Sequence, residues 1–100
     1  MSERASVAGD VVLRFAPHVR FRFDETRHAW VILAPERLLL PDEQAVEILK
    51  LVDGKAGVGA IIDVLAGRYT QAPHELIARD VTEMLQDLAD KGCLARVDAH

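Results

Sequence analysis

The period of the hydrophobic pattern changes once along this chain, close to Pro41. Before Pro41, apolar residues alternate with polar ones or form short β-branched and aromatic runs, which is typical of strands. After it, they recur every three or four residues, which is typical of helices. Strands followed by helices in one small domain predict an α+β fold. Three N-terminal strands followed by three helices, with a short turn between helices, indicate a winged helix-turn-helix-like architecture.

The strands are predicted from alternation and from β-branched content. The segment V-R-F-R-F-D is the first, H-A-W-V-I-L is the second, and a short turn between them makes a hairpin the economical interpretation. A three-residue loop would place Val31 and Leu33 beside the phenylalanines. A two-residue loop would place Trp30 and Ile32 there, because a one-residue slip reverses every side chain. The pattern leaves both registers open, and the third strand follows over Arg37 to Leu40.

Each of the three predicted helices has its own start and stop signals. The first has Asp42 as a candidate N-cap and stops at Asp53-Gly54. The second runs from about Val58 to Arg68, after the weak cap Gly57. The third is the longest, and it extends from Pro73 in its first turn to Gly92 at its C-terminal end.

One domain is expected over residues 15–97, after a flexible N-terminal tail at residues 1–14, because a chain of 100 residues holds one modest core. Residues 93–97 would add a short last strand or lie against that core. The single cysteine, Cys93, excludes an internal disulfide. The N-terminus lacks the apolar stretch of a secretion signal, and no apolar run is long enough to span a bilayer. The predicted location is cytoplasmic, without membrane contact.

No catalytic or metal site is predicted. The histidines at positions 18, 28, 74 and 100 are far apart and form no metal-binding spacing. The chain contains neither a phosphate-binding loop of the G-x-x-x-x-G-K-[ST] type nor G-x-G-x-x-G. Cys93 follows the helix-stopping Gly92, so a small buried hydrophobic residue is the preferred interpretation over a reactive thiol. We therefore expect a protein that is not an enzyme and carries no cofactor.

A winged-helix DNA-binding regulator is the alternative function, because the outline of the fold fits one. A recognition helix must offer cations to phosphates. The third predicted helix carries five acidic residues against Arg79 and Lys91, so its charge has the wrong sign. Arg20 and Arg22 beside Trp30 resemble a basic and aromatic RNA-binding surface, although a solvated strand face is the preferred interpretation. No nucleic-acid partner is expected.

The segment A-P-E-R-L-L-L-P-D-E carries the main functional hypothesis. In an extended chain Leu38 and Leu40 share one face, whereas Leu39 takes the other. If the hairpin pairs with only one side of this strand, its other edge remains open to an incoming strand. A peptide would then add to the edge and place side chains in a groove beside a helix. The alternative is a central or covered strand whose three leucines all belong to the core.

An ordered series of segments along the chain resembles the PqqD family of pyrroloquinoline quinone (PQQ) biosynthesis. The series consists of P-E-R-L-L-L, I-L-K-L-V-D-G, I-I-D-V-L-A-G-R-Y, D-V-T-E-M-L-Q-D-L and G-C-L, and the similarity runs from about Pro17 to Val97. The resemblance implies a non-catalytic peptide chaperone of the kind called a RiPP recognition element. Such a protein binds the precursor peptide PqqA and presents it to the radical SAM enzyme PqqE.

The family's groove lies between the third strand and the third helix. Carried over to this chain, it predicts a peptide-binding site made of residues from both segments: Arg37, Leu38, Leu39, Leu40, Leu76, Asp80, Glu83 and Met84. The helical residues are chosen from helical spacing together with the family groove. The same free edge would also accept a second copy of the chain, so a homodimer is a further expectation.

Overall fold

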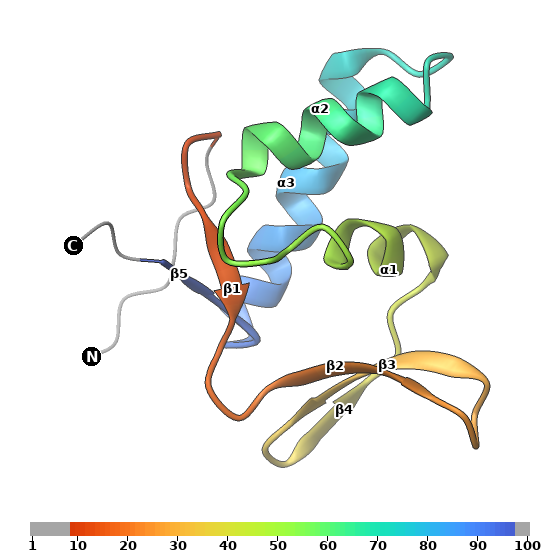
Figure 1. Ribbon diagram of the computed structural model, residues 1–100, viewed down its shortest axis with the longest axis vertical. Helices are drawn as coiled ribbons and strands as arrows, with labels where there is room; N and C mark the ends of the chain where they lie inside the picture. Colours follow the sequence, from red (N-terminus) through yellow and green to blue (C-terminus); the bar gives the residue numbers. More distant parts are fainter. Residues whose placement is uncertain (1–8, 98–100) are drawn as a thin grey trace.

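The computed structural model describes residues 9–97. Four strands precede three helices and a fifth strand follows them, so the fold is mixed, with strands first and helices second, as predicted (Figure 1). The elements, in chain order, are β1 (Leu13–Phe15), β2 (Arg20–Asp24), β3 (Ala29–Ala34), β4 (Arg37–Leu39), α1 (Glu43–Leu49), α2 (Val58–Arg68), α3 (His74–Asp90) and β5 (Leu94–Arg96).

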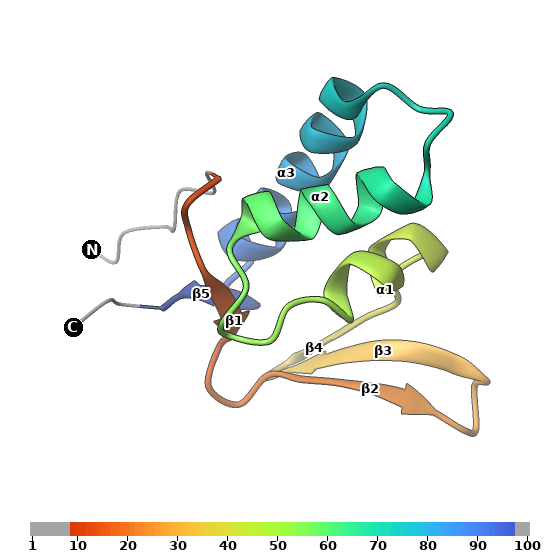
Figure 2. The ribbon, with the colours of Figure 1, turned by 45° about the horizontal axis from the view of Figure 1, so that its top comes forward.

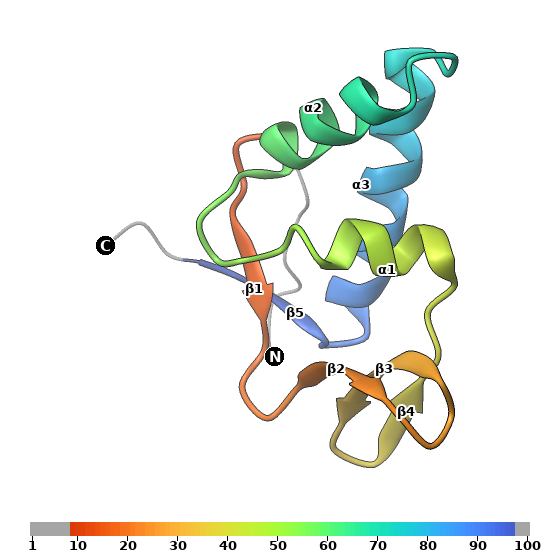
Figure 3. The ribbon, with the colours of Figure 1, turned by 45° about the vertical axis from the view of Figure 1, so that its right-hand side comes forward.

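The strands form two separate antiparallel sheets. One contains β2, β3 and β4 in that order, and the other pairs β1 with β5. Helix α1 lies between the three-stranded sheet and α2, and the views agree on this (Figures 1 and 2). Strands β1 and β5 lie side by side next to the C-terminal end of α3 (Figure 3). The predicted strands correspond to β2, β3 and β4.

The prediction of a flexible N-terminal tail over residues 1–14 is wrong for residues 9–14. Residues 1–8 lie outside the described residues. Leu13 pairs with Arg96 in the two-stranded sheet. The Leu13 side chain is only 1% exposed, and Val11 is also buried. The domain therefore begins before position 15. Val11 and Leu13 are apolar residues at alternate positions, which is the pattern of a strand. The pattern covers too few residues to be recognised from the sequence.

The N-terminal segment also completes the start of α2. Gly57 offers no side-chain cap, as expected. Instead, the Val58 N–H donates to the carbonyl of Val11 at 2.9 Å, and the Gly59 N–H donates to the carbonyl of Gly9 at 2.8 Å. These bonds satisfy donors that every helix start leaves free. A Cβ atom at Gly59 would lie 3.1 Å from the Gly9 oxygen, which explains a glycine within the first helical turn.

The hairpin adopts the arrangement that places Trp30 and Ile32 beside the phenylalanines. Phe21 pairs with Ile32, and Phe23 pairs with Trp30. The loop is longer than either predicted loop, because the last pair joins Asp24 to Ala29. Paired residues share a face, so Arg20 and Arg22 lie on the face opposite Trp30. The arginines and the tryptophan thus form no common surface on which a nucleic-acid base would stack.

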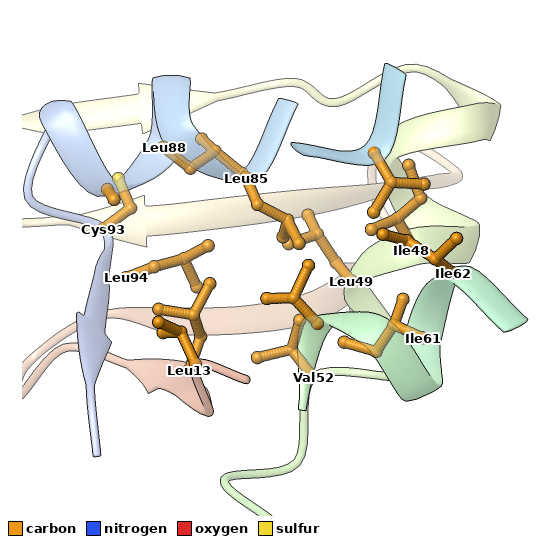
Figure 4. Close-up of a cluster of buried hydrophobic side chains, with 14 of the residues drawn as sticks. Leu13, Ile48, Leu49, Val52, Ile61, Ile62, Leu85, Leu88, Cys93 and Leu94 are labelled. Carbon is orange, nitrogen blue, oxygen red and sulfur yellow. The ribbon is translucent and has the colours of Figure 1, made fainter. Parts of the chain in front are cut away.

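The core joins one face of the three-stranded sheet, the small sheet and all three helices. Figure 4 shows Leu13 and Leu94 together at one end of this cluster, and Ile48 and Ile62 at the other. The Leu85 side chain lies between them, fully buried. Two helix boundaries follow the predicted signals: Asp42 accepts a hydrogen bond from the Ala45 N–H at 2.8 Å at the start of α1, and α3 ends before Gly92, whose φ is +80°. The predicted end of the first helix at Asp53-Gly54 is wrong, because α1 already ends at Leu49.

Candidate functional site

Strand β4 is an edge strand of its sheet. It pairs with β3 on one side, and within residues 9–97 no strand pairs with its other side. A two-residue turn at Pro35-Glu36 joins the two strands, so the pair Ala34 and Arg37 closes the turn with a hydrogen bond. Hydrogen-bonded and non-bonded pairs alternate along an antiparallel ladder. Leu33 and Leu38 therefore form a pair without backbone hydrogen bonds between them. The N–H and C=O of Leu38 point away from β3, toward the free edge.

The three leucines divide between the two faces of the sheet. The Leu39 side chain is half-buried and packs against the core cluster. The Leu38 and Leu40 side chains are 40% and 62% exposed. They lie on the face opposite Leu39, because successive strand residues point in opposite directions. The expectation of an open edge therefore matches the geometry better than the alternative in which all three leucines are core.

The segment from Arg37 to Asp42 comes near α3 and its C-terminal end at two points. At the start of the segment, the Arg37 guanidinium is close enough to Cys93 to oppose the burial that raises the pKa of the thiol. At the end of the segment, Asp42 shares a cleft with Asp80 and Glu83 of α3. The strand therefore begins near the C-terminal end of α3 and leads toward the middle of the helix.

The structure brings together three of the four predicted helix residues. Asp80, Glu83 and Met84 line the cleft with Asp42. Leu76 lies one turn earlier and lines a neighbouring cavity instead. Sequence reasoning missed the opposite wall of the cleft, which comes from α1: Asp42, Gln44, Ala45 and Ile48. Their helical spacing was visible, but no pattern indicated that α1 lies across from α3.

The cleft is acidic. Three of its lining side chains are carboxylates, those of Asp42, Asp80 and Glu83, and no lining residue is basic. In the described part of the chain, neither Asp80 nor Glu83 forms an ion pair. Carboxylates that line a concave surface attract cations and raise the rate at which a basic ligand arrives.

A polar cluster joins α1 to the end of α2. The Tyr69 hydroxyl donates to a Glu47 carboxylate oxygen, and the Arg68 Nη1 donates to the other at 3.0 Å. The Tyr69 hydroxyl, and secondarily the Arg68 guanidinium, hold the pKa of Glu47 below its usual range. The same carboxylate raises the pKa of the Tyr69 hydroxyl. The cluster fixes the position of α1 relative to α2.

Substitution of Tyr69→Phe is expected to lower the melting temperature by a few degrees near neutral pH, where the ionised Glu47 accepts the hydroxyl bond. A carboxyl group with a lowered folded-state pKa stabilises the fold above its unfolded pKa, and this stability is lost as pH falls through the folded pKa. The difference between wild type and variant should therefore shrink on acidification. Thermal unfolding followed by circular dichroism measures it, and an equal difference at neutral and acid pH would contradict the assignment.

The described residues offer no centre for metal or thiol chemistry. Between residues 9 and 97, no group of three or more His, Cys, Asp or Glu side chains could hold a metal ion. Cys93 is fully buried, as predicted, and burial raises the pKa of its thiol, which disfavours the reactive thiolate. Among the helices of the described part, none has the length and apolar character needed to cross a bilayer.

Comparison with known proteins gives consistent results. The family model described as "Coenzyme PQQ synthesis protein D (PqqD)" matches residues 29–94. A relative from Rhodopseudomonas palustris (strain TIE-1), named PqqA binding protein, is 68% identical over 77 residues, which are 77% of this chain and 74% of the relative. The bifunctional coenzyme PQQ synthesis protein C/D of Methylorubrum extorquens is 42% identical over 95% of this chain, which corresponds to 25% of that longer protein.

A solved structure shows the same fold. It is the solution NMR structure of the PqqD truncation of Methylobacterium extorquens PqqCD, described as a functional and stand-alone RiPP recognition element. The two chains superpose with a TM-score of 0.73 and 43% sequence identity, over 90% of this chain and 95% of the other. At this identity the likeness extends beyond the fold to the family.

Proposed function

This chain belongs to the PqqD family, and from that premise we propose that it binds the precursor peptide PqqA by strand addition at the free edge of β4. The observation that carries the proposal is the open edge of β4, whose register directs the Leu38 backbone outward, followed at Asp42 by the acidic cleft of α1 and α3. Relatives named PqqA binding protein support the choice of peptide.

Both faces of the added strand find partners in this arrangement. The peptide backbone bonds to the N–H and C=O of Leu38, which gives affinity independent of sequence. Its outward side chains lie next to Leu38 and Leu40, at the spacing of cross-strand pairs. Its inward side chains point toward Met84 and the carboxylates of the cleft. Apolar residues alternating with small or basic ones would suit these contacts.

The proposal includes the rest of the pathway role. The chain acts without catalysis, in the cytoplasm, and presents the bound peptide to the radical SAM enzyme PqqE. A relative that combines this domain with a second PQQ synthesis protein in one chain supports a place beside the enzymes of that pathway. Burial of Cys93 and the absence of a metal-binding group between residues 9 and 97 are compatible with a non-catalytic role.

We interpret the fold as a winged helix-turn-helix variant adapted to peptides, with α2 and α3 as the helical pair and the β2–β3 hairpin as the wing. The alternative of a DNA-binding regulator is not favoured. Helix α3 would have to approach phosphates with its exposed Asp80, Glu83 and Asp87. A gel-shift assay with duplex DNA should show no complex at low salt, where nonspecific binding is strongest.

Titration of isotope-labelled protein with synthetic PqqA tests the proposed site. The largest changes in amide NMR shifts are expected at Arg37–Leu40 and at residues 80–84 of α3, because these segments contact the added strand. Addition of PqqE should then broaden the signals of the loaded protein, as a larger complex forms. Changes confined to α2 would contradict the site, and unchanged spectra would contradict the function.

The same edge would also pair with a second copy of the chain, which remains a prediction. Peptide and second copy would then compete for β4. Sedimentation velocity should show any dimer dissociating as PqqA is added. A dimer that persists at peptide saturation would place the interface elsewhere.

A further inference from the structure

A second cavity lies next to the acidic cleft, between α1, the end of α2 and the first half of α3. Its volume is about 230 Å³. Its floor is apolar and contains the buried side chains of Ile48, Leu65, Ile77 and Val81. Ala72 lies at the α2–α3 turn and also lines it. Replacing the water above such a floor by an apolar group is favourable, because it removes apolar surface from water.

The mouth of this cavity exposes two large side chains that a folded domain would normally cover. Leu76 is 40% exposed and Tyr69 is 47% exposed, and both line the cavity. Two carboxylates also line it. Glu47 is engaged by Tyr69 and Arg68, whereas Asp80 has no ion-pair partner in the part of the chain that the structure describes. The cavity therefore combines an apolar interior with one available negative charge at its edge.

The cavity is continuous with the acidic cleft between α1 and α3. Gln44, Ile48 and Asp80 line both. From Asp80 to Leu76 the helix rises about 6 Å, which an extended peptide covers with about two residues. A peptide that leaves β4 at its Leu40 end and continues along α3 therefore reaches the cavity within a few residues.

We propose that this cavity is a second anchor for the bound peptide and takes one large apolar side chain, with a basic neighbour in the peptide reaching Asp80. The inference rests on the proposed peptide-binding function and specifies what that function selects. The size supports a side chain rather than a cofactor. Pockets for small molecules usually measure about 300 to 1,000 Å³, whereas an apolar cavity of about 150 Å³ already admits a benzene ring.

The decisive variants alter the cavity and leave β4 unchanged. Leu76→Gln removes part of the apolar wall at an exposed helical position, and Ala72→Leu fills the interior. Val64→Gln is the matched control, because Val64 is an aliphatic residue on α2 with a similar exposure, 44%, and does not line the cavity. With synthetic PqqA and isothermal titration calorimetry, Leu76→Gln and Ala72→Leu are each expected to weaken binding about tenfold. The control should bind as wild type does.

An alanine scan of the peptide identifies the anchored residue. Alanine at one apolar peptide position should weaken binding to the wild-type protein. The same substitution should hardly change binding to the Ala72→Leu variant, because the leucine already fills the cavity. Asp80→Asn should weaken binding more at low salt than at high salt, because salt screens the attraction between Asp80 and a basic peptide residue. If the cavity variants both bind like wild type while a β4 variant loses the peptide, the anchor is overturned and the proposed function stands. If no variant of either site changes binding, strand addition also fails.

Discussion

Leu38→Pro is expected to weaken PqqA binding at least tenfold, because the substitution removes the outward N–H of β4 and places a proline ring against the incoming strand. Proline is tolerated in edge strands where the lost N–H faces solvent. The N–H of Leu38 faces solvent, because Leu38 is opposite Leu33 in a pair without backbone hydrogen bonds. The variant should therefore fold normally, and calorimetry or fluorescence anisotropy with labelled peptide should report the loss.

Two further substitutions separate backbone pairing from other effects. Leu38→Ala keeps the N–H and removes only the exposed side chain, so it should weaken binding less than proline does. Leu39→Pro removes a donor that faces β3, because Leu39 pairs with Ile32. It should lower the melting temperature, in contrast to Leu38→Pro. A folded Leu38→Pro variant with wild-type affinity would exclude strand addition at this edge.

Leu13→Ala is expected to destabilise the domain by about 2–5 kcal/mol and to lower its melting temperature by at least about 10 °C. The side chain is 1% exposed and packs in the main core, where Figure 4 shows it next to Leu94. Removing it leaves a cavity that the two short strands cannot close. Denaturant unfolding gives the free energy, and thermal unfolding gives the temperature.

The neighbouring Arg14→Ala is the control for Leu13→Ala. Arg14 lies in the same strand but is exposed, so its loss should change stability by no more than about 0.5 kcal/mol. Equal, small effects of both substitutions would mean that β1 does not belong to the folded domain in solution. The experiment thus distinguishes a structural N-terminal strand from the flexible tail that the sequence pattern predicted.

The helices were predictable because their signals are local. An apolar residue every three or four positions, a capping Asp42 and a terminal Gly92 lie within one turn of the structure they determine. The division of Leu38, Leu39 and Leu40 between two faces was predictable for the same reason, since alternation belongs to any extended chain. The choice of α3 residues for the groove depended on helical spacing and on the family resemblance. Asp80, Glu83 and Met84 line one cleft together with α1, and their contact with a peptide stays a prediction.

The remainder depended on contacts between distant parts of the chain. Leu13 pairs with Arg96, more than eighty residues away, and three-residue strands leave no recognisable period. The wall that α1 contributes to the cleft, the separate cavity of Leu76 and the hairpin register likewise follow from packing. The helical segments and the leucines that share a face could be identified without a structure, because these properties arise from neighbouring residues. The open strand edge and its surroundings could not, because they depend on which distant surfaces bury one another most completely.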